Sequence, residues 1–309
     1  MAHHTIGLAL GSGSARGWAH IGALKALEAE GIYPDIICGS SIGALVGAAY
    51  VTETMDALEH GIRAFNWRSM LGYMDIQLNA GGVLQGDKLV KFFKGKIGEH
   101  TIGEQKIAYG AVATDLKSGQ EIWLREGEIL DVVRASVALP GLLAPVNYQG
   151  RWLLDGGLVN PVPVSLCRAM GADIVIAVNL NGDIIGKHFR EKDMEASSLF
   201  GKEKEHEEVL VDKVANYLGG ALKAKAGALF SLAGAKGTPP GVLDVMASSI
   251  NIMQDRITRS RMAGDPPDII LAPRLGHIGL FEFDQSEEVI AAGWQETMKQ
   301  MVDIKLLIK

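Results

Sequence analysis

Residues that could carry out acyl transfer occur in three short segments of this 309-residue chain. The first segment is GSSIG, Gly39 to Gly43, in which Ser41 lies between two glycines. Glycines at these positions remove side chains where a strand and a helix crowd each other, so a sharp turn can hold the serine hydroxyl exposed. Ser41 is therefore the candidate nucleophile. The alternative is an ordinary glycine-tightened turn with a spectator serine.

The second segment supplies a carboxylate that could act as the base. Residues 151–154, RWLL, predict a mostly apolar strand, which places Asp155 at the strand end, followed by Gly156 and Gly157. This placement would aim the carboxylate into a site, whereas an Asp-Gly turn without chemistry is the alternative. Asp115, at the end of another predicted strand, is a competing carboxylate, and we favour a turn-forming role for it.

The third segment is a glycine-rich loop, with Gly11, Ser12, Gly13, Ser14 and Arg16 between an apolar strand and a helix. A dinucleotide fingerprint would need an acid at the end of the next strand, but that strand ends in the serine turn. Small residues at a helix N-terminus instead leave backbone N–H groups directed at the crevice of the serine, which indicates an oxyanion-binding loop. Arg16 would brace this loop or add positive potential. A tight turn without chemistry is the alternative.

Apolar periodicity predicts a chain in which strands and helices alternate. The first strand, glycine-rich turn, helix and second strand form a βαβ unit. Strands are expected at 5–10, 35–38, 106–114, 120–124, 151–154, 173–179 and 267–272, and helices at 18–30, 42–50, 52–66, 86–96, 128–136, 161–170, 242–262 and 286–302.

We expect one domain over residues 5–309 with an insert. Residues 183–240 shift in composition, first dense in charge and then rich in Ala, Gly, Leu and Lys, which predicts a helical insert or lid. Most amphipathic helices cover their own core, so plain packing is favoured there over lipid contact. The irregular segment 67–82 would lie over the site.

Composition excludes several classes of function. The net charge of −6 and the scarcity of Lys/Arg clusters argue against a nucleic-acid partner. Cys38 and Cys167 form no disulfide framework, suit a reducing compartment and are interpreted as core residues. We therefore expect no metal and no cofactor. The histidines that form no metal-ligand spacing are His60, His100, His188 and His206.

The sequence also predicts a cytoplasmic location. The first residues, MAHHTIG, lack the basic region, apolar run and cleavage site of a signal peptide. The sequence contains no uninterrupted run of about 18 to 20 apolar residues, the length that a helix needs to span a bilayer. Contact with a membrane would therefore be peripheral, at its inner face, and the oligomeric state is open.

Taken together, the segments resemble the patatin-like phospholipase family, especially its small bacterial members. The similarity covers nearly the whole of residues 5–180 and resumes at PPDIILAP and in the final helix. The sequences that carry it are LALGSGSARGWAHIGALKALEAEGI, CGSSIGALVGAAY, ATDLKSGQEIWL, VRASVALPGLLAPV and DGGLVNPVPV.

This resemblance implies a fold, a reaction and site residues. The fold would be a three-layer α/β/α arrangement with a mainly parallel central sheet and a helical insert. The enzyme would be a lipid acyl hydrolase of the phospholipase A, lysophospholipase or carboxylesterase type. Ser41 and Asp155 would form a Ser-Asp dyad that passes through an acyl-serine intermediate, without a histidine. Backbone N–H groups of Gly11 to Ser14 would form the oxyanion hole, although the family usually has consecutive glycines where this chain has Ser12 and Ser14.

Two alternatives remain open. One is an α/β-hydrolase triad in which His277 joins Ser41 and Asp155, although Ser41 follows only the second predicted strand, which is early for that fold. The other is a non-catalytic adaptor that keeps the fold and binds a partner through the charged residues 186–208. His20, in the first helix, is interpreted as a structural residue rather than a catalytic one.

Overall fold

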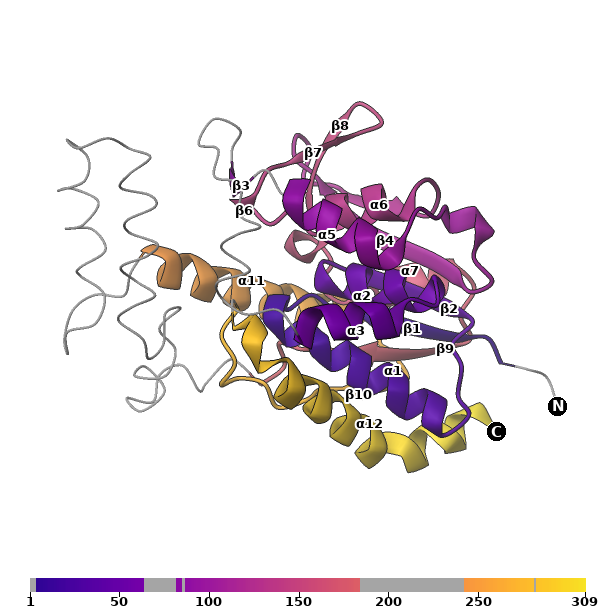
Figure 1. Cartoon of the computed structure of the whole chain (residues 1–309). Helices are drawn as coiled ribbons and strands as arrows, with labels where there is room; N and C mark the ends of the chain where they lie inside the picture. Colours follow the sequence, from indigo (N-terminus) through magenta and orange to yellow (C-terminus); the bar gives the residue numbers. More distant parts are fainter. Residues whose placement is uncertain (1–3, 64–81, 85–86, 184–241, 281) are drawn as a thin grey trace, which may run out of the picture.

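An eight-stranded sheet with helices on both faces forms the centre of the part of the chain that the structure describes (Figure 1). The computed structural model describes residues 4–63, 82–84, 87–183, 242–280 and 282–309. Along the sheet the strand order is β10 (Ile269–Leu271), β9 (Ile174–Val178), β1 (Ile6–Leu10), β2 (Ile36–Ser40), β4 (Ala108–Asp115), β8 (Arg151–Asp155) and β7 (Val146–Tyr148), with β5 (Glu121–Leu124) also paired to β4.

The sheet is parallel through its centre and antiparallel at one side. Neighbouring strands from β10 to β4 are parallel, whereas β8, β7 and β5 join by antiparallel pairing. The short strands β3 (Gly82–Leu84) and β6 (Gly141–Leu143) form a separate parallel pair. Since parallel neighbours require crossover connections, the helices between them must cover the faces of the sheet.

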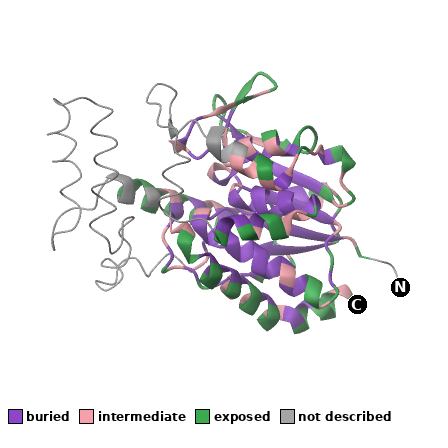
Figure 2. Ribbon diagram, viewed as in Figure 1, coloured by how far each residue is buried: buried purple, intermediate pink, exposed green. Residues whose placement is uncertain are grey.

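Helices lie on both faces of this sheet. Leu8 and Leu10 of β1 point into the larger apolar cluster, which includes residues of α1, α2, α6 and α12, whereas Ala9 points to the cluster under α7. The strands at the centre are buried along their whole length (Figure 2). The three-layer α/β/α prediction is confirmed. The helices are α1 (Ala19–Ala29), α2 (Ile42–Val51), α3 (Met55–Arg63), α5 (Asp87–Ile97), α6 (Ile129–Ser136), α7 (Val164–Ala169), α11 (Val242–Gly264) and α12 (Ser286–Ile308).

One edge of β4 is shared by two strands. Residues 108–112 pair with β2, and residues 113–115 pair with β8. On β5, residues 121–124 pair with 111–114 of β4, so β5 overlaps both registers and must occupy the opposite edge. It follows that β2 and β8 meet end to end along a single edge. Ser40 pairs with Val112, and Asp155 pairs with the next residue, Ala113.

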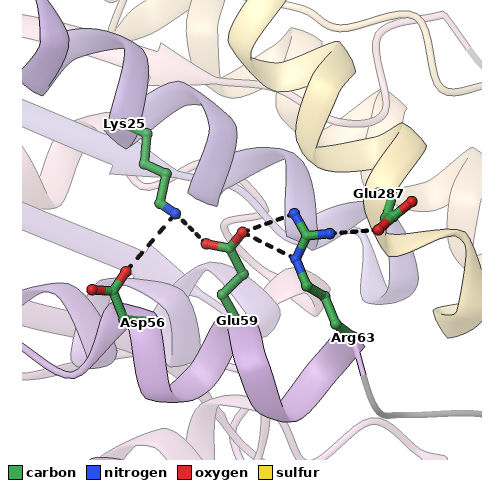
Figure 3. A network of polar contacts seen from close by, with 5 residues as sticks. All are labelled: Lys25, Asp56, Glu59, Arg63 and Glu287. Atoms are coloured by element: carbon green, nitrogen blue, oxygen red, sulfur yellow. Dashed lines mark hydrogen bonds and ion pairs between the residues drawn. The ribbon is translucent and has the colours of Figure 1, made fainter.

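A network of charged side chains ties α3 to two helices that are distant in sequence (Figure 3). Glu59 of α3 pairs with Lys25 of α1, and it also accepts hydrogen bonds from Arg63 at 3.0 and 3.2 Å. Arg63 in turn reaches Glu287 at the start of α12, at 2.5 Å. Burial alone would raise the pKa of Glu59, but the hydrogen bonds from Lys25 and Arg63 outweigh it and lower that pKa. Asp56 lies 3.9 Å from Lys25 at the exposed end of the network.

Most predicted elements are present with shifted ends. The closing helix α12 continues to Ile308 rather than ending near 302, and the helix expected at 161–170 is shortened to Val164–Ala169. Pro163 explains the late start, because a residue that precedes proline disfavours the helical conformation, which keeps Val162 out of the helix. The predicted insert at 183–240 and the segment 67–82 lie almost entirely outside the described residues, so the single-domain assignment stays a prediction.

Helices α1 and α12 approach each other closely through glycine. A Cβ atom added to Gly293 would lie 2.0 Å from the carbonyl oxygen of Ala19, and one added to Gly22 would lie 1.9 Å from that of Ile290. These contacts are with backbone atoms, which cannot rotate away. The two helices can therefore keep their present separation only with glycine at the crossing.

We expect Gly293→Ala to lower the free energy of unfolding by about 1–3 kcal/mol, because the added methyl group overpacks a backbone contact. The matched control is Gly95→Ala in α5, where no heavy atom lies within 4 Å of the added Cβ. That change should raise stability by about 0.4–1 kcal/mol through the loss of unfolded-state entropy. Urea denaturation of both variants tests the contrast, and equal stability of Gly293→Ala and the wild type would contradict the packing argument.

Candidate functional site

Ser41 sits at a strained turn between β2 and α2. Its backbone has φ 56° and ψ −124°, an unfavourable combination for a residue with a side chain. The flanking glycines permit this turn: a Cβ on Gly43 would lie 2.2 Å from the carbonyl oxygen of Leu10, and one on Gly39 would lie 2.4 Å from the nitrogen of Ala44. The predicted strand-turn-helix context of Ser41 is therefore present, and the side chain is half-buried.

Asp155 lies directly against the serine. The Ser41 hydroxyl donates a hydrogen bond to Oδ2 of Asp155 at 2.6 Å, and the backbone N–H of Gly157 donates to Oδ1 at 2.7 Å. These two residues are 114 positions apart in sequence. The end-to-end meeting of β2 and β8 brings them together, because β2 ends at the residue before Ser41 and β8 ends at Asp155.

The two glycines after Asp155 are required by close neighbours. A Cβ on Gly156 would lie 2.2 Å from the carbonyl oxygen of Val112, and one on Gly157 would lie 2.8 Å from the Ser12 hydroxyl oxygen. A side chain at position 156 would therefore collide with the backbone of β4, whereas one at position 157 would have to displace the side chains of Ser12 and Gln254. The supporting role of both glycines stays a prediction.

Burial sets the acidity of Asp155. The residue is only 1% exposed, and desolvation raises the pKa of its carboxyl group from 3.8 to about 6, although the hydrogen bonds from Ser41 and Gly157 act in the opposite direction. A more basic carboxylate results, which remains ionised at neutral pH. Of the apolar residues that precede Asp155 on β8, Leu153 is fully buried, whereas Trp152 is 54% exposed.

Ser136, at the end of α6, contacts the serine turn and was missed by sequence reasoning. Its hydroxyl oxygen accepts a hydrogen bond from the backbone N–H of Ser41 at 3.0 Å and donates one to the carbonyl oxygen of Val112 at 2.7 Å. The residue is fully buried. Ser136 lies in the VRASVALPG segment, one of those that carry the family resemblance, and an isolated serine in a helix gives no local signal of this contact.

The glycine-rich loop presents two backbone N–H groups without acceptors in the described part of the chain. The N–H groups of Gly11 and Ser12 donate to the carbonyl oxygens of Val178 and Pro161, at 3.1 and 2.8 Å. Those of Gly13 and Ser14 have no acceptor among the described residues. Ser14, which stands where the family usually has glycine, has φ 51°. It therefore adopts the left-handed conformation that glycine would favour.

Two buried side chains hold this loop from behind. Arg16 donates to the carbonyl oxygen of Gly13 at 3.3 Å and to Oδ1 of Asn251 at 2.7 Å, and its burial lowers its pKa to about 10, still far above neutrality. Nε2 of His20 lies 2.7 Å from the carbonyl oxygen of Gly11, and burial lowers the pKa of this histidine to about 4. Arg16 thus braces the loop, and His20 has the structural position that the sequence suggested.

Other candidate residues lie elsewhere. Asp115 accepts hydrogen bonds from the backbone N–H groups of Lys117 and Ser118 at 3.0 and 2.8 Å, which is the turn-forming role favoured for it. His277 is exposed, and its Nε2 lies 2.7 Å from Oε1 of Glu288. No imidazole intervenes between the paired hydroxyl and carboxylate, which argues against the triad alternative.

The described residues contain no cluster of three or more His, Cys, Asp or Glu side chains that could hold a metal ion. Cys38 and Cys167 are both buried and unbridged, as expected for core residues. Among the helices of the described ranges, none combines the length and the apolar character needed to cross a bilayer.

Comparison with known proteins decides the family. The model of the patatin-like phospholipase family matches residues 8–168. The chain belongs to the patatin-like phospholipase family. The matched residues include the turn at Ser41, Ser136 and Asp155, whereas α11 and α12 lie beyond them. Family membership implies a lipid hydrolase.

Three individual proteins illustrate the similarity. An NTE family protein of Mycobacterium tuberculosis, described as uncharacterized, is 32% identical over 321 residues, covering 93% of this chain and 89% of that protein. The lysophospholipase nte1 of Aspergillus fumigatus is 32% identical over 180 residues, 57% of this chain and 12% of that protein. VipD of Legionella pneumophila matches with a TM-score of 0.46 and 14% identity, covering 97% of this chain and 67% of VipD.

The raised pKa of Asp155 predicts a pH-dependent stability difference from Asp155→Asn. Because folding raises this pKa, the protonated Asp155 carboxyl group contributes to the stability of the wild type. This contribution is fully present below pH 3.8 and is lost as the pH rises through about 6. The free energy of unfolding of Asp155→Asn minus that of the wild type should therefore increase between about pH 4 and pH 6, by on the order of 3 kcal/mol.

Denaturation across this pH range measures the difference, with Asp115→Asn as the matched control. Hydrogen bonds from Ser118 chiefly lower the pKa of Asp115, so the sign is reversed there: the wild type should gain stability over Asp115→Asn as the pH rises. A flat difference for Asp155→Asn would mean that its carboxyl group is not desolvated in the folded protein.

Proposed function

We propose that the protein is a serine-dependent lipid acyl hydrolase of the phospholipase A, lysophospholipase or carboxylesterase type. Ser41 would be the nucleophile and Asp155 the general base. The observation that carries this proposal is the 2.6 Å hydrogen bond from the Ser41 hydroxyl to Oδ2 of Asp155. A nucleophile and a base within hydrogen-bonding reach, with the base oriented by the Gly157 N–H, have the arrangement that covalent catalysis requires.

In the first step the Ser41 oxygen forms a bond to the ester carbonyl carbon while its proton passes to Asp155. A carboxylate is a much weaker base than a serine alkoxide, so complete proton transfer before attack would be steeply uphill. Transfer therefore accompanies attack. The burial that raises the pKa of Asp155 to about 6 makes the carboxylate a better acceptor for this proton while leaving it ionised at neutral pH.

Negative charge on the carbonyl oxygen is stabilised by the glycine-rich loop. We assign this role to the N–H groups of Gly13 and Ser14, because those of Gly11 and Ser12 are already bonded to backbone carbonyls. Collapse of the tetrahedral intermediate breaks the ester C–O bond, and the leaving alcohol takes the proton from Asp155. Water then attacks the acyl-serine with Asp155 again as base, which releases the fatty acid and restores the Ser41 hydroxyl.

Lipid esters are the proposed substrates. Family membership implies a lipid hydrolase, and one relative carries the name lysophospholipase, so phospholipids and lysophospholipids are the first classes to examine. A panel of p-nitrophenyl esters of graded chain length, run beside phospholipids, would establish the acyl preference. A contact with the membrane surface, if present, would be peripheral.

We expect a fluorophosphonate probe to label wild-type protein at Ser41 and to leave Ser41→Ala unlabelled. Asp155→Asn should lose at least about a hundredfold in the rate of ester hydrolysis while remaining folded, because an amide cannot accept the serine proton. Folded wild-type protein that neither reacts with the probe nor hydrolyses esters would favour the non-catalytic adaptor. Full activity of Asp155→Asn would remove the carboxylate from the mechanism.

A second prediction separates the dyad from a triad. The rate constant kcat/KM should rise with pH to a plateau, with a midpoint near the Asp155 pKa of about 6, because only the ionised carboxylate accepts the proton. His277→Ala should retain wild-type activity, since that imidazole pairs with Glu288 at the surface. Loss of activity in His277→Ala that Glu288→Ala does not reproduce would support the triad instead.

A further inference from the structure

One short segment of the chain touches the backbone of both residues of the candidate pair. The hydroxyl oxygen of Ser136 accepts a hydrogen bond from the Ser41 N–H at 3.0 Å. Two residues later, the carbonyl oxygen of Ala138 accepts one from the Asp155 N–H at 2.9 Å. The end of α6 therefore spans the place where β2 and β8 meet.

This meeting place leaves a gap in the hydrogen-bonding ladder of β4. Pairing with β2 stops at Val112, and pairing with β8 starts at Ala113. The carbonyl oxygen of Val112 takes its hydrogen bond from the Ser136 hydroxyl at 2.7 Å. Ser136 thus satisfies the carbonyl of β4 with its proton and the N–H of Ser41 with its oxygen, using both functions of one hydroxyl group.

We propose that Ser136 is a positioning residue that fixes the backbone of Ser41 at the distance where its hydroxyl meets Asp155. The proposal rests on the function assigned above, because it deepens the account of the same site. Ser136 touches neither the ester nor the reacting oxygen; it acts through the N–H of Ser41. Its chemistry requires a small side chain that donates and accepts at the same time, in a fully buried position.

Backbone geometry explains why the turn needs such a constraint. At φ 56° and ψ −124°, Ser41 holds a conformation that a residue with a side chain adopts only when its surroundings impose it. The flanking glycines permit the turn but do not hold it. A hydrogen bond from the Ser41 N–H to a group anchored on β4 does hold it, because β4 also carries the strand that ends in Asp155.

The test compares Ser136→Ala with three other variants. Ser136→Cys keeps a similar volume with a much weaker hydrogen-bonding group, and Ser136→Thr keeps the hydroxyl. Ser286→Ala, at the start of α12, is the matched control, because it removes a buried hydroxyl of the same size outside the candidate site. The readouts are kcat and KM for a p-nitrophenyl ester, the rate of fluorophosphonate labelling, and hydrogen exchange of the peptide that contains the Ser41 amide.

For Ser136→Ala we expect kcat and the labelling rate to fall about 10- to 100-fold while KM stays within about twofold, because the serine oxygen is misplaced and the binding surface is not. Exchange at the Ser41 amide should become faster. Ser136→Cys should lie between Ser136→Ala and the wild type, Ser136→Thr should recover most of the rate, and Ser286→Ala should match the wild type.

Wild-type kcat and wild-type amide exchange in folded Ser136→Ala would overturn the proposal, as would equal losses in Ser136→Ala and Ser286→Ala. If Ser136→Ala does not fold, Ser136→Cys replaces it in the same comparison. Absence of hydrolysis and labelling in the wild type would reject the proposed function, and the exchange of the Ser41 amide would then decide by itself whether Ser136 holds this turn.

Discussion

The structure of the candidate site depends on the edge of β4, where two strands meet end to end. A residue of a strand can pair with one neighbour on each edge, so β8 can begin on this edge only where β2 has left it. The chain leaves this edge after β2 through Ser41, and β8, which runs in the opposite direction, ends at Asp155 beside that point. The hydroxyl–carboxylate contact is thus produced by strand pairing, and the two residues need no flexible loop to reach each other.

Both residues of the pair are held in states that are unfavourable in isolation. Ser41 has a strained backbone, and the Asp155 carboxylate is desolvated. Such costs persist only where the surrounding structure is rigid, and here the surroundings are the buried strands β2, β4 and β8 and the end of α6. The features that cost folding energy are also those that aim the hydroxyl and raise the basicity of the carboxylate.

The local sequence predicted the helices and strands and identified Ser41 and Asp155 as candidates, but it did not predict the strand pairing that brings these two residues together. Predicted strands just before Ser41 and Asp155 identified two strand ends, and the family resemblance joined them. The shared edge of β4 could not be predicted, because pairing between strands that are distant in sequence leaves no trace in local periodicity. Ser136 was missed for the same reason: its partners, Ser41 and Val112, lie on other elements.

Helix α11 departs from the usual rule that a helix buries its apolar face. Its buried side chains include Asn251, Gln254 and Asp255, which recur at helical spacing, so the stripe facing the protein is polar. Burying polar groups is unfavourable unless they are paired, and here Asn251 accepts from Arg16 while Gln254 accepts from Asn181, whose side chain also donates to the carbonyl oxygen of Ser12. An apolar surface could not receive this stripe. The helix therefore docks specifically against the glycine-rich loop, and its Gln254 side chain also lies beside Gly157.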